Sequence, residues 1–144
     1  MQSKTNKPTF LYWFISVIGL IWNLMGVDAY INQVYRTERF KDMYTESQLE
    51  IINNLPVFYT IVFTVAVFAS VLGCVFLLLR KKIATYALLI ALIAIIIQVS
   101  YNLFLNEGKE MYGTMEYSML FLIPLFGLIL FWNAKNALKK GYLS

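Results

Sequence analysis

Four long runs without a charged residue divide the chain, and each is dominated by aliphatic and aromatic side chains. The runs cover residues 10–27, 55–79, 83–106 and 117–134. At a rise of about 1.5 Å per residue, each run forms a helix of about 27 Å or more, close to or beyond the roughly 30 Å of a hydrocarbon core. Continuous apolar runs lack the alternation of barrel strands, so the pattern predicts four membrane-spanning helices.

The polar segment 28–54 is the longest connection between these runs. Thr45 followed by Gln48 three residues later is typical of a helix N-terminus, and Leu49 and Ile52 then share one helical face. These residues predict a short amphipathic helix. The fold class expected from the sequence is therefore an all-α membrane protein, a four-transmembrane-helix bundle with a short amphipathic helical cap in the first outer loop.

Composition supports a membrane protein and limits its chemistry. Of the 144 residues, 60% are apolar and 14% charged, and the mean hydropathy is +0.65. There is no sign of a second domain, so residues 1–144 are expected to form one membrane domain. The sequence has no histidine and a single cysteine, Cys74. Disulfide frameworks, thiolate or imidazole metal sites and histidine-dependent catalysis are therefore excluded within one chain, and we expect no cofactor.

The charged residues are distributed unequally between the two ends of the predicted bundle. One end, with both termini and the connection 80–82, has only basic residues: Lys4, Lys7, Arg80, Lys81, Lys82, Lys135, Lys139 and Lys140. The other end, with loops 28–54 and 107–116, has four basic and eight acidic residues. By the positive-inside rule both termini are expected in the cytoplasm. The net charge of +4 thus reflects topology rather than a nucleic-acid partner, and the lipid bilayer is the expected environment.

The first run admits a second interpretation, because basic residues precede it and residues 27–29 resemble a signal-peptide cleavage site. The run is long for a signal peptide and rich in aromatic residues typical of membrane interfaces. These are Tyr12, Trp13, Phe14 and Trp22. We therefore expect a retained helix, and the spacing of Tyr30 and Val34 indicates that it continues beyond the membrane.

Small and polar residues recur every three or four positions, as expected where membrane helices meet. In the first run they are Ser16, Gly19, Asn23 and Gly26; in the second, Ala66, Ser70, Gly73 and Cys74; in the third, Ala84, Ala87, Ala91, Ala94 and Gln98. The candidate site comprises the polar residues of these faces near the outer boundary: Asn23, Asp28, Tyr30, Gln98, Tyr101 and Asn102. Two interpretations remain open for them. The amides of Asn23 and Gln98 either bond to one another and fix the bundle, or line an outward-opening vestibule with the other residues.

The sequence gives little support to an enzyme. The apolar runs contain no charged residue, so they cannot supply an acid–base pair, an intramembrane carboxylate pair or a metal site. Neither catalytic nor metal-binding residues are expected. Two non-enzymatic functions remain: a facilitator for a neutral polar solute such as a sugar, which would need a homodimer at this size, and an accessory subunit that binds another membrane protein through its outer cap or helix faces.

Three strings resemble a family of small bacterial four-helix inner-membrane proteins, often labelled "sugar transporter". They are "TFLYWFISVIGLIWNLMGVDAY", "LPVFYTIVFTVAVFASVLGCVFLLLRKKIA" and the C-terminal "KKGYL". The resemblance extends over nearly the whole chain. It implies a bacterial inner-membrane location and the same topology, and it favours transport modestly, since the label corresponds to no defined set of sugar-binding residues.

Overall fold

The computed structural model describes residues 6–105 and 113–144, and helices account for most of these residues. The long helices are α1 (Phe10–Tyr35), α4 (Val57–Leu78), α5 (Ile83–Ser100) and α6 (Thr114–Lys139). The short elements are α2 (Glu38–Asp42), α3 (Glu46–Asn53) and the π-helical turn η1 (Tyr101–Leu105), which continues α5. Each of the four long segments, with η1 counted as part of α5, is long and apolar enough to cross a membrane.

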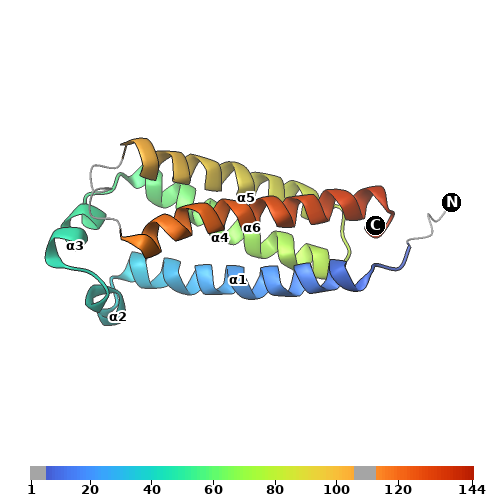
Figure 1. Cartoon of the computed structure of the whole chain (residues 1–144), viewed down its shortest axis with the longest axis horizontal. Coiled ribbons are helices and arrows are strands. Elements are labelled where there is room, and N and C mark those ends of the chain that lie inside the picture. The colour runs from blue at the N-terminus through green and yellow to red at the C-terminus, as the bar shows by residue number, and fades with distance from the viewer. Residues whose placement is uncertain (1–5, 106–112) are drawn as a thin grey trace.

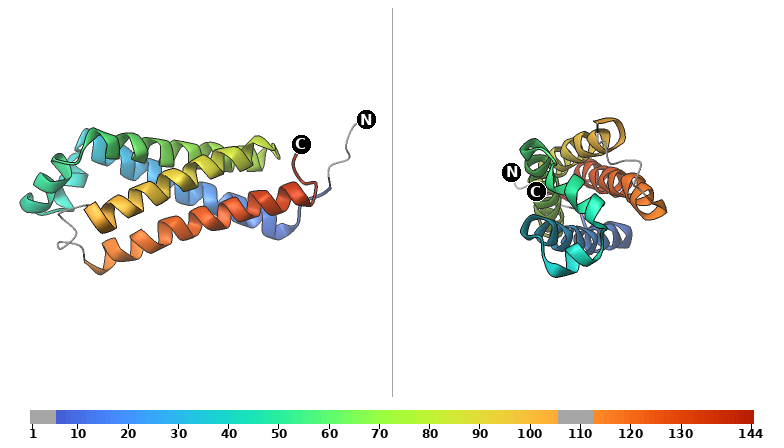
Figure 2. Two further views of the ribbon diagram at one scale, coloured as in Figure 1. Left: turned by 90° about the horizontal axis from the view of Figure 1, so that it is seen from above. Right: turned by 90° about the vertical axis from the view of Figure 1, so that its left-hand side faces the viewer.

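The four long helices form an up-down-up-down bundle (Figure 1). Viewed along the long axis they form a ring in the order α1, α4, α5, α6 (Figure 2). One end, here called the terminal end, holds both chain termini and residues 80–82 (Figure 1). The opposite end, here called the loop end, holds α2 and α3 (Figure 1). This arrangement confirms the predicted all-helical fold with four long apolar helices.

The predicted helix boundaries are close to the observed ones, with differences at the ends. The first helix continues past residue 27 to Tyr35, as its spacing indicated, and ends with Arg36 in a left-handed conformation. The second long helix begins after Pro56, which is its N-cap, close to the predicted start at residue 55. The fourth long helix, Thr114–Lys139, is longer than the predicted 117–134 because polar residues on both sides of the apolar run are also helical. Most of the expected connection 107–116 lies outside the described residues.

The predicted amphipathic helix in the segment 28–54 is present as α3. The hydroxyl of Thr45 accepts the Gln48 amide N–H at 3.3 Å, and the Gln48 side chain accepts the Thr45 N–H at 3.0 Å. This capping box confirms the prediction for the helix start, because it satisfies two amides that the helix itself leaves unpaired. Arg36 joins α1 to this segment, since its Nε donates to Asn53 Oδ1 at 2.7 Å.

Small residues allow close helix contacts at two of the predicted positions. A Cβ atom added to Gly73 would lie 2.5 Å from a methyl carbon of Leu88, and one added to Gly19 would overlap the side chain of Leu130. Glycine therefore allows α4 to pack closely on Leu88 of α5, and α1 on Leu130 of α6. Gly26, expected on the same inward face as Gly19, instead meets nothing within 4 Å. That expectation was wrong, because α1 crosses from α6 toward α4 as it approaches the loop end (Figure 2).

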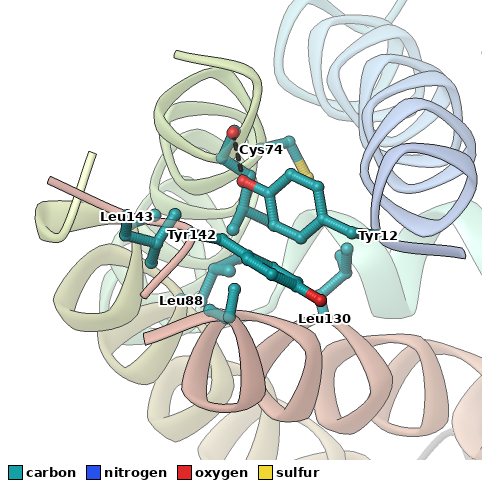
Figure 3. Close-up of a cluster of buried hydrophobic side chains, with 10 residues drawn as sticks. Tyr12, Cys74, Leu88, Leu130, Tyr142 and Leu143 are labelled. Carbon is teal, nitrogen blue, oxygen red and sulfur yellow. Dashed lines mark hydrogen bonds between the residues drawn. The ribbon is translucent and has the colours of Figure 1, made fainter. Parts of the chain in front are cut away.

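The larger core cluster lies at the terminal end (Figure 3). It contains Tyr12, Cys74, Leu77, Ala84, Leu88, Leu130, Ala134, Ala137, Tyr142 and Leu143. The last two belong to the C-terminal segment, which folds back under the bundle. There the Ser144 N–H donates to the Arg80 carbonyl at 2.9 Å, and the Lys82 N–H donates to the Ser144 carbonyl at 3.1 Å. We call residues 141–144 the C-terminal clasp.

Candidate functional site

Tyr59 of α4 is the centre of the polar group at the loop end. Its hydroxyl oxygen accepts a hydrogen bond from Gln98 Nε2 at 3.1 Å and another from Asn102 Nδ2 at 3.1 Å. Gln98 and Asn102 are four residues apart, so they project from the same face of the continuous α5–η1 segment. Tyr59 is buried. The Tyr59 hydroxyl therefore connects two amide side chains of α5–η1 to α4.

The backbone around Asn102 departs from the α-helical repeat. Residues Tyr101–Leu105 form a π-helical turn, a geometry that shifts side chains relative to a regular helix and often occurs at functional positions. Asn102 is buried there, and the ring of Tyr101 lies 5.2 Å from that of Tyr59. The turn thus brings both residues to the same tyrosine.

Tyr30 of α1 joins this group through aromatic contacts. Its hydroxyl lies 2.7 Å from Thr64 Oγ1, and its ring stacks on Phe63 at 5.3 Å. The Phe63 ring also stacks against Tyr59 at 6.4 Å. The structure therefore brings together Tyr30, Gln98, Tyr101 and Asn102, four of the six predicted residues.

Two residues that organise this group, Tyr59 and Phe63, were not singled out from the sequence. The signal for Tyr59 was present, because it lies seven residues before Ala66 and so extends the predicted α4 stripe by two turns. Tyr59 nevertheless differs from the small residues and amides that typify membrane-helix contacts. Phe63 has no such signal in a segment rich in phenylalanine.

Asn23 lies elsewhere in the bundle, with a different partner. Its Nδ2 donates to the Cys74 sulfur at 3.3 Å, whereas Gln98 bonds to Tyr59. Tyr59 and Cys74 are fifteen residues apart on α4, a rise of about 22 Å. The structure therefore does not show the contact between Asn23 and Gln98 that the sequence suggested; the two amides occupy different depths in the bundle.

A small cavity lies beside Asn23 in the middle of the bundle. Its volume is about 20 Å³, and Asn23 and Ser70 are its polar lining residues among apolar ones from α1, α5 and α6. A space of this size holds about one water molecule. It is too small for a sugar.

Asp28 is separate from both groups. Its carboxylate lies 2.6 Å from the guanidinium of Arg39, and both side chains are exposed. An exposed pair of this kind contributes little to stability, so Asp28 is a surface residue between α1 and α2 and does not enter the bundle interior.

A third polar contact, at the terminal end, was only partly expected. Asn133 Nδ2 donates to Ser16 Oγ at 3.3 Å, and Ser16 Oγ donates to the Tyr12 carbonyl at 2.8 Å. The hydroxyl of Tyr12 in turn donates to the Leu77 carbonyl (Figure 3). Ser16 belonged to the predicted stripe of the first run, but Asn133 was not among the predicted contact residues.

The chemistry these groups offer is hydrogen bonding. Amides, hydroxyls and one thiol meet inside the bundle, and the described part of the chain contains no cluster of three side chains suited to a metal ion. The Cys74 thiol is buried and bonded to Asn23, so it is not placed to act as a nucleophile.

Comparisons of this chain with protein-family models, with curated proteins and with solved structures find no match.

Proposed function

We propose that this chain is a multi-pass protein of the bacterial inner membrane with both termini in the cytoplasm. Support comes from four helices long and apolar enough to span. Among residues 6–105 and 113–144, the terminal end has basic side chains such as Lys7, Arg80 and Lys140 and no Asp or Glu side chain, whereas the acidic side chains belong to segments at the opposite end of the spans. Cytoplasmic loops carry such an excess of Lys and Arg.

Within the membrane we propose a non-enzymatic accessory role, in which the protein binds another membrane protein. One observation supports this role above the others: the candidate polar residues of the interior are bonded to neighbouring helices. Gln98 and Asn102 bond to Tyr59, Tyr30 pairs with Thr64, and Asn23 bonds to Cys74. A solute pathway would leave such groups facing a continuous space, and solute sites usually measure hundreds of Å³.

The partner surface that we propose includes an outer cap formed by α2 and α3. Phe40 of α2 supports this position, because it is 5% exposed and its ring lies 5.0 Å from that of Tyr44, between the two helices. Burial, the Glu116 carboxylate and Tyr59 raise the pKa of Tyr44, as expected for a residue that packs onto the loop end of the bundle. Their outer surface carries exposed charges of both signs, including Glu38 and Lys41, as at the polar rim of a protein interface.

Purification in mild detergent after cross-linking in the native membrane tests this role. We expect one membrane protein at a fixed stoichiometry, identified by mass spectrometry. The matched variants are Glu50→Arg in the cap, which reverses an exposed charge on α3, and Lys139→Glu, which reverses one at the terminal end. The cap variant should lose the partner and the other should retain it. Recovery of the chain without a stoichiometric partner would contradict the accessory role.

A further inference from the structure

A second and larger cavity opens at the terminal end, between the first turn of α1 and the last turns of α6. Its volume is about 170 Å³. It is lined by Thr9, Leu11, Tyr12, Trp132, Asn133, Asn136, Ala137, Lys140 and Tyr142. One water needs roughly 10–15 Å³ on the same measure, so this cavity accommodates a polar group of several heavy atoms.

Two nearly fully buried side chains in its lining retain unused hydrogen-bonding capacity. Tyr142 is 7% exposed and Asn133 is 3% exposed. The Tyr142 hydroxyl has no hydrogen-bond partner among residues 6–105 and 113–144, and Asn133 uses only its amide nitrogen, on Ser16. In Figure 3 the Tyr142 ring extends from the C-terminal clasp toward α6, which forms one wall of the cavity. Neither atom is among the fully buried side-chain atoms without a partner in the described residues, so both are open to the cavity and can bond to a group bound there.

The charge around the cavity is positive. Lys140 lies in its lining, exposed to solvent. No Asp or Glu occurs before residue 28 or after residue 116, so no carboxylate side chain from α1, α6 or the clasp competes for it. The N-terminus of α1, capped by Thr9, also faces this space, and the partial positive charge of its free N–H groups favours an anion. The Lys140 ammonium, the Tyr142 hydroxyl and the Asn136 amide together provide the donors that a phosphate group requires.

The rim of the cavity is apolar. Leu11 and Trp132 line it and are each 55% exposed on the outer surface of the bundle. In the proposed membrane orientation, the cavity lies at the level of the cytoplasmic headgroups, with apolar surface directed toward the acyl chains. Basic pockets between transmembrane helices on this side bind acidic lipid headgroups.

We propose that this cavity binds the phosphate and glycerol of one anionic phospholipid of the cytoplasmic leaflet. The phosphate contacts Lys140 and the Tyr142 hydroxyl, and the acyl chains lie over Leu11 and Trp132. This inference rests on the proposed insertion into the membrane and its orientation, but it does not require the accessory role.

Native mass spectrometry of the full chain tests the proposal, with phosphatidylglycerol and phosphatidylcholine added together in equal amounts. We expect one retained phosphatidylglycerol and little phosphatidylcholine. Lys140→Ala should reduce retention about five-fold, the value of one Lys–headgroup contact, and Tyr142→Phe should also reduce it while leaving its aromatic packing on Tyr12 intact. Lys139→Ala, which removes an equal charge outside the cavity lining, should leave retention unchanged.

Several outcomes would overturn the proposal. Equal retention of the two lipids would show that the cavity does not select an anionic headgroup. Equal losses for Lys140→Ala and Lys139→Ala would show only a general attraction of the lipid to basic charge. A thermal shift with inorganic phosphate alone, lost in Lys140→Ala, would identify a soluble phosphate compound instead of a lipid. None of these results bears on partner recovery, so failure of this proposal and failure of the accessory role are separable.

Discussion

At the scale of single residues, the bundle depends on a few polar contacts between helices. Tyr59 accepts hydrogen bonds from two amides, and in hydrocarbon such contacts contribute roughly 0.6–2 kcal/mol each. Removing the shared acceptor therefore breaks two hydrogen bonds at once, and that loss exceeds the loss of one donor.

Tyr59→Phe should lower the free energy of unfolding by about 1–3 kcal/mol. The expected reason is the loss of both amide contacts with little change in volume. Thermal unfolding in mild detergent measures it. Tyr86→Phe serves as the control, since Tyr86 is largely exposed on α5, and an equal effect in the two variants would show that Tyr59 has no special role.

A double-mutant cycle tests whether the two amides that the sequence suggested as partners interact. Asn23→Leu and Gln98→Leu should give additive losses of stability, because the amides bond to Cys74 and Tyr59 at different depths. Gln98→Leu and Tyr59→Phe should be non-additive, because these residues share a contact. An interaction energy above about 0.5 kcal/mol between Asn23 and Gln98 would contradict the observed pairing.

The raised pKa of Tyr44 predicts that the stability of the folded protein decreases at alkaline pH. Burial, then Glu116 and Tyr59, raise its pKa in the folded protein, so its contribution is fully present below the unfolded pKa near 10 and is lost as pH rises through the higher folded value. The melting temperature of the wild type should therefore decline more steeply above about pH 10 than that of Tyr44→Phe. Parallel curves for the two proteins would show that Tyr44 is not desolvated at the loop end.

At the scale of helices, glycine positions decide which surfaces meet. Gly73 lies against Leu88, whereas Gly26 faces open space. Sequence spacing alone placed Gly19 and Gly26 on the same contact face, which is correct for one straight helix. It could not show that α1 leaves α6 toward the loop end, because crossing angles arise from the packing of all four helices.

Alanine substitutions at these two glycines should have opposite effects. Gly73→Ala should destabilise the protein by about 1–3 kcal/mol, because the new methyl group would overlap Leu88. Gly26→Ala should be neutral or stabilise it by up to about 1 kcal/mol through helix propensity. Thermal unfolding distinguishes the two, and a comparable loss for Gly26→Ala would indicate a helix contact that the structure lacks.

At the scale of the whole molecule, hydropathy and charge predicted four long helices, and Thr45 with Gln48 predicted the start of α3. These features are local, so a single sequence contains them. The arrangement of the site is not local. Grouping Gln98, Asn102 and Tyr101 followed from their spacing, but their common partner Tyr59, the π-helical turn and the separate depth of Asn23 depend on how helices distant in sequence align.

The C-terminal clasp closes the terminal end of the molecule and should contribute to its global stability. Leu143→Ala removes a buried side chain from the core cluster and should cost about 2–5 kcal/mol. Leu79→Ala, at an exposed position, is the matched control. Chemical unfolding in detergent compares them, and similar small losses in both variants would show that the clasp is not part of the cooperative unit.

The central claim is that the polar interior holds the helices together and conducts no solute. Flux of neutral sugars into liposomes that contain the purified chain tests it most directly. We expect uptake equal to that of protein-free liposomes, both for the wild type and for Tyr59→Phe. Uptake by the wild type, reduced in Tyr59→Phe or Gln98→Leu, would contradict the claim. It would place Tyr59, Gln98 and Asn102 in a solute pathway.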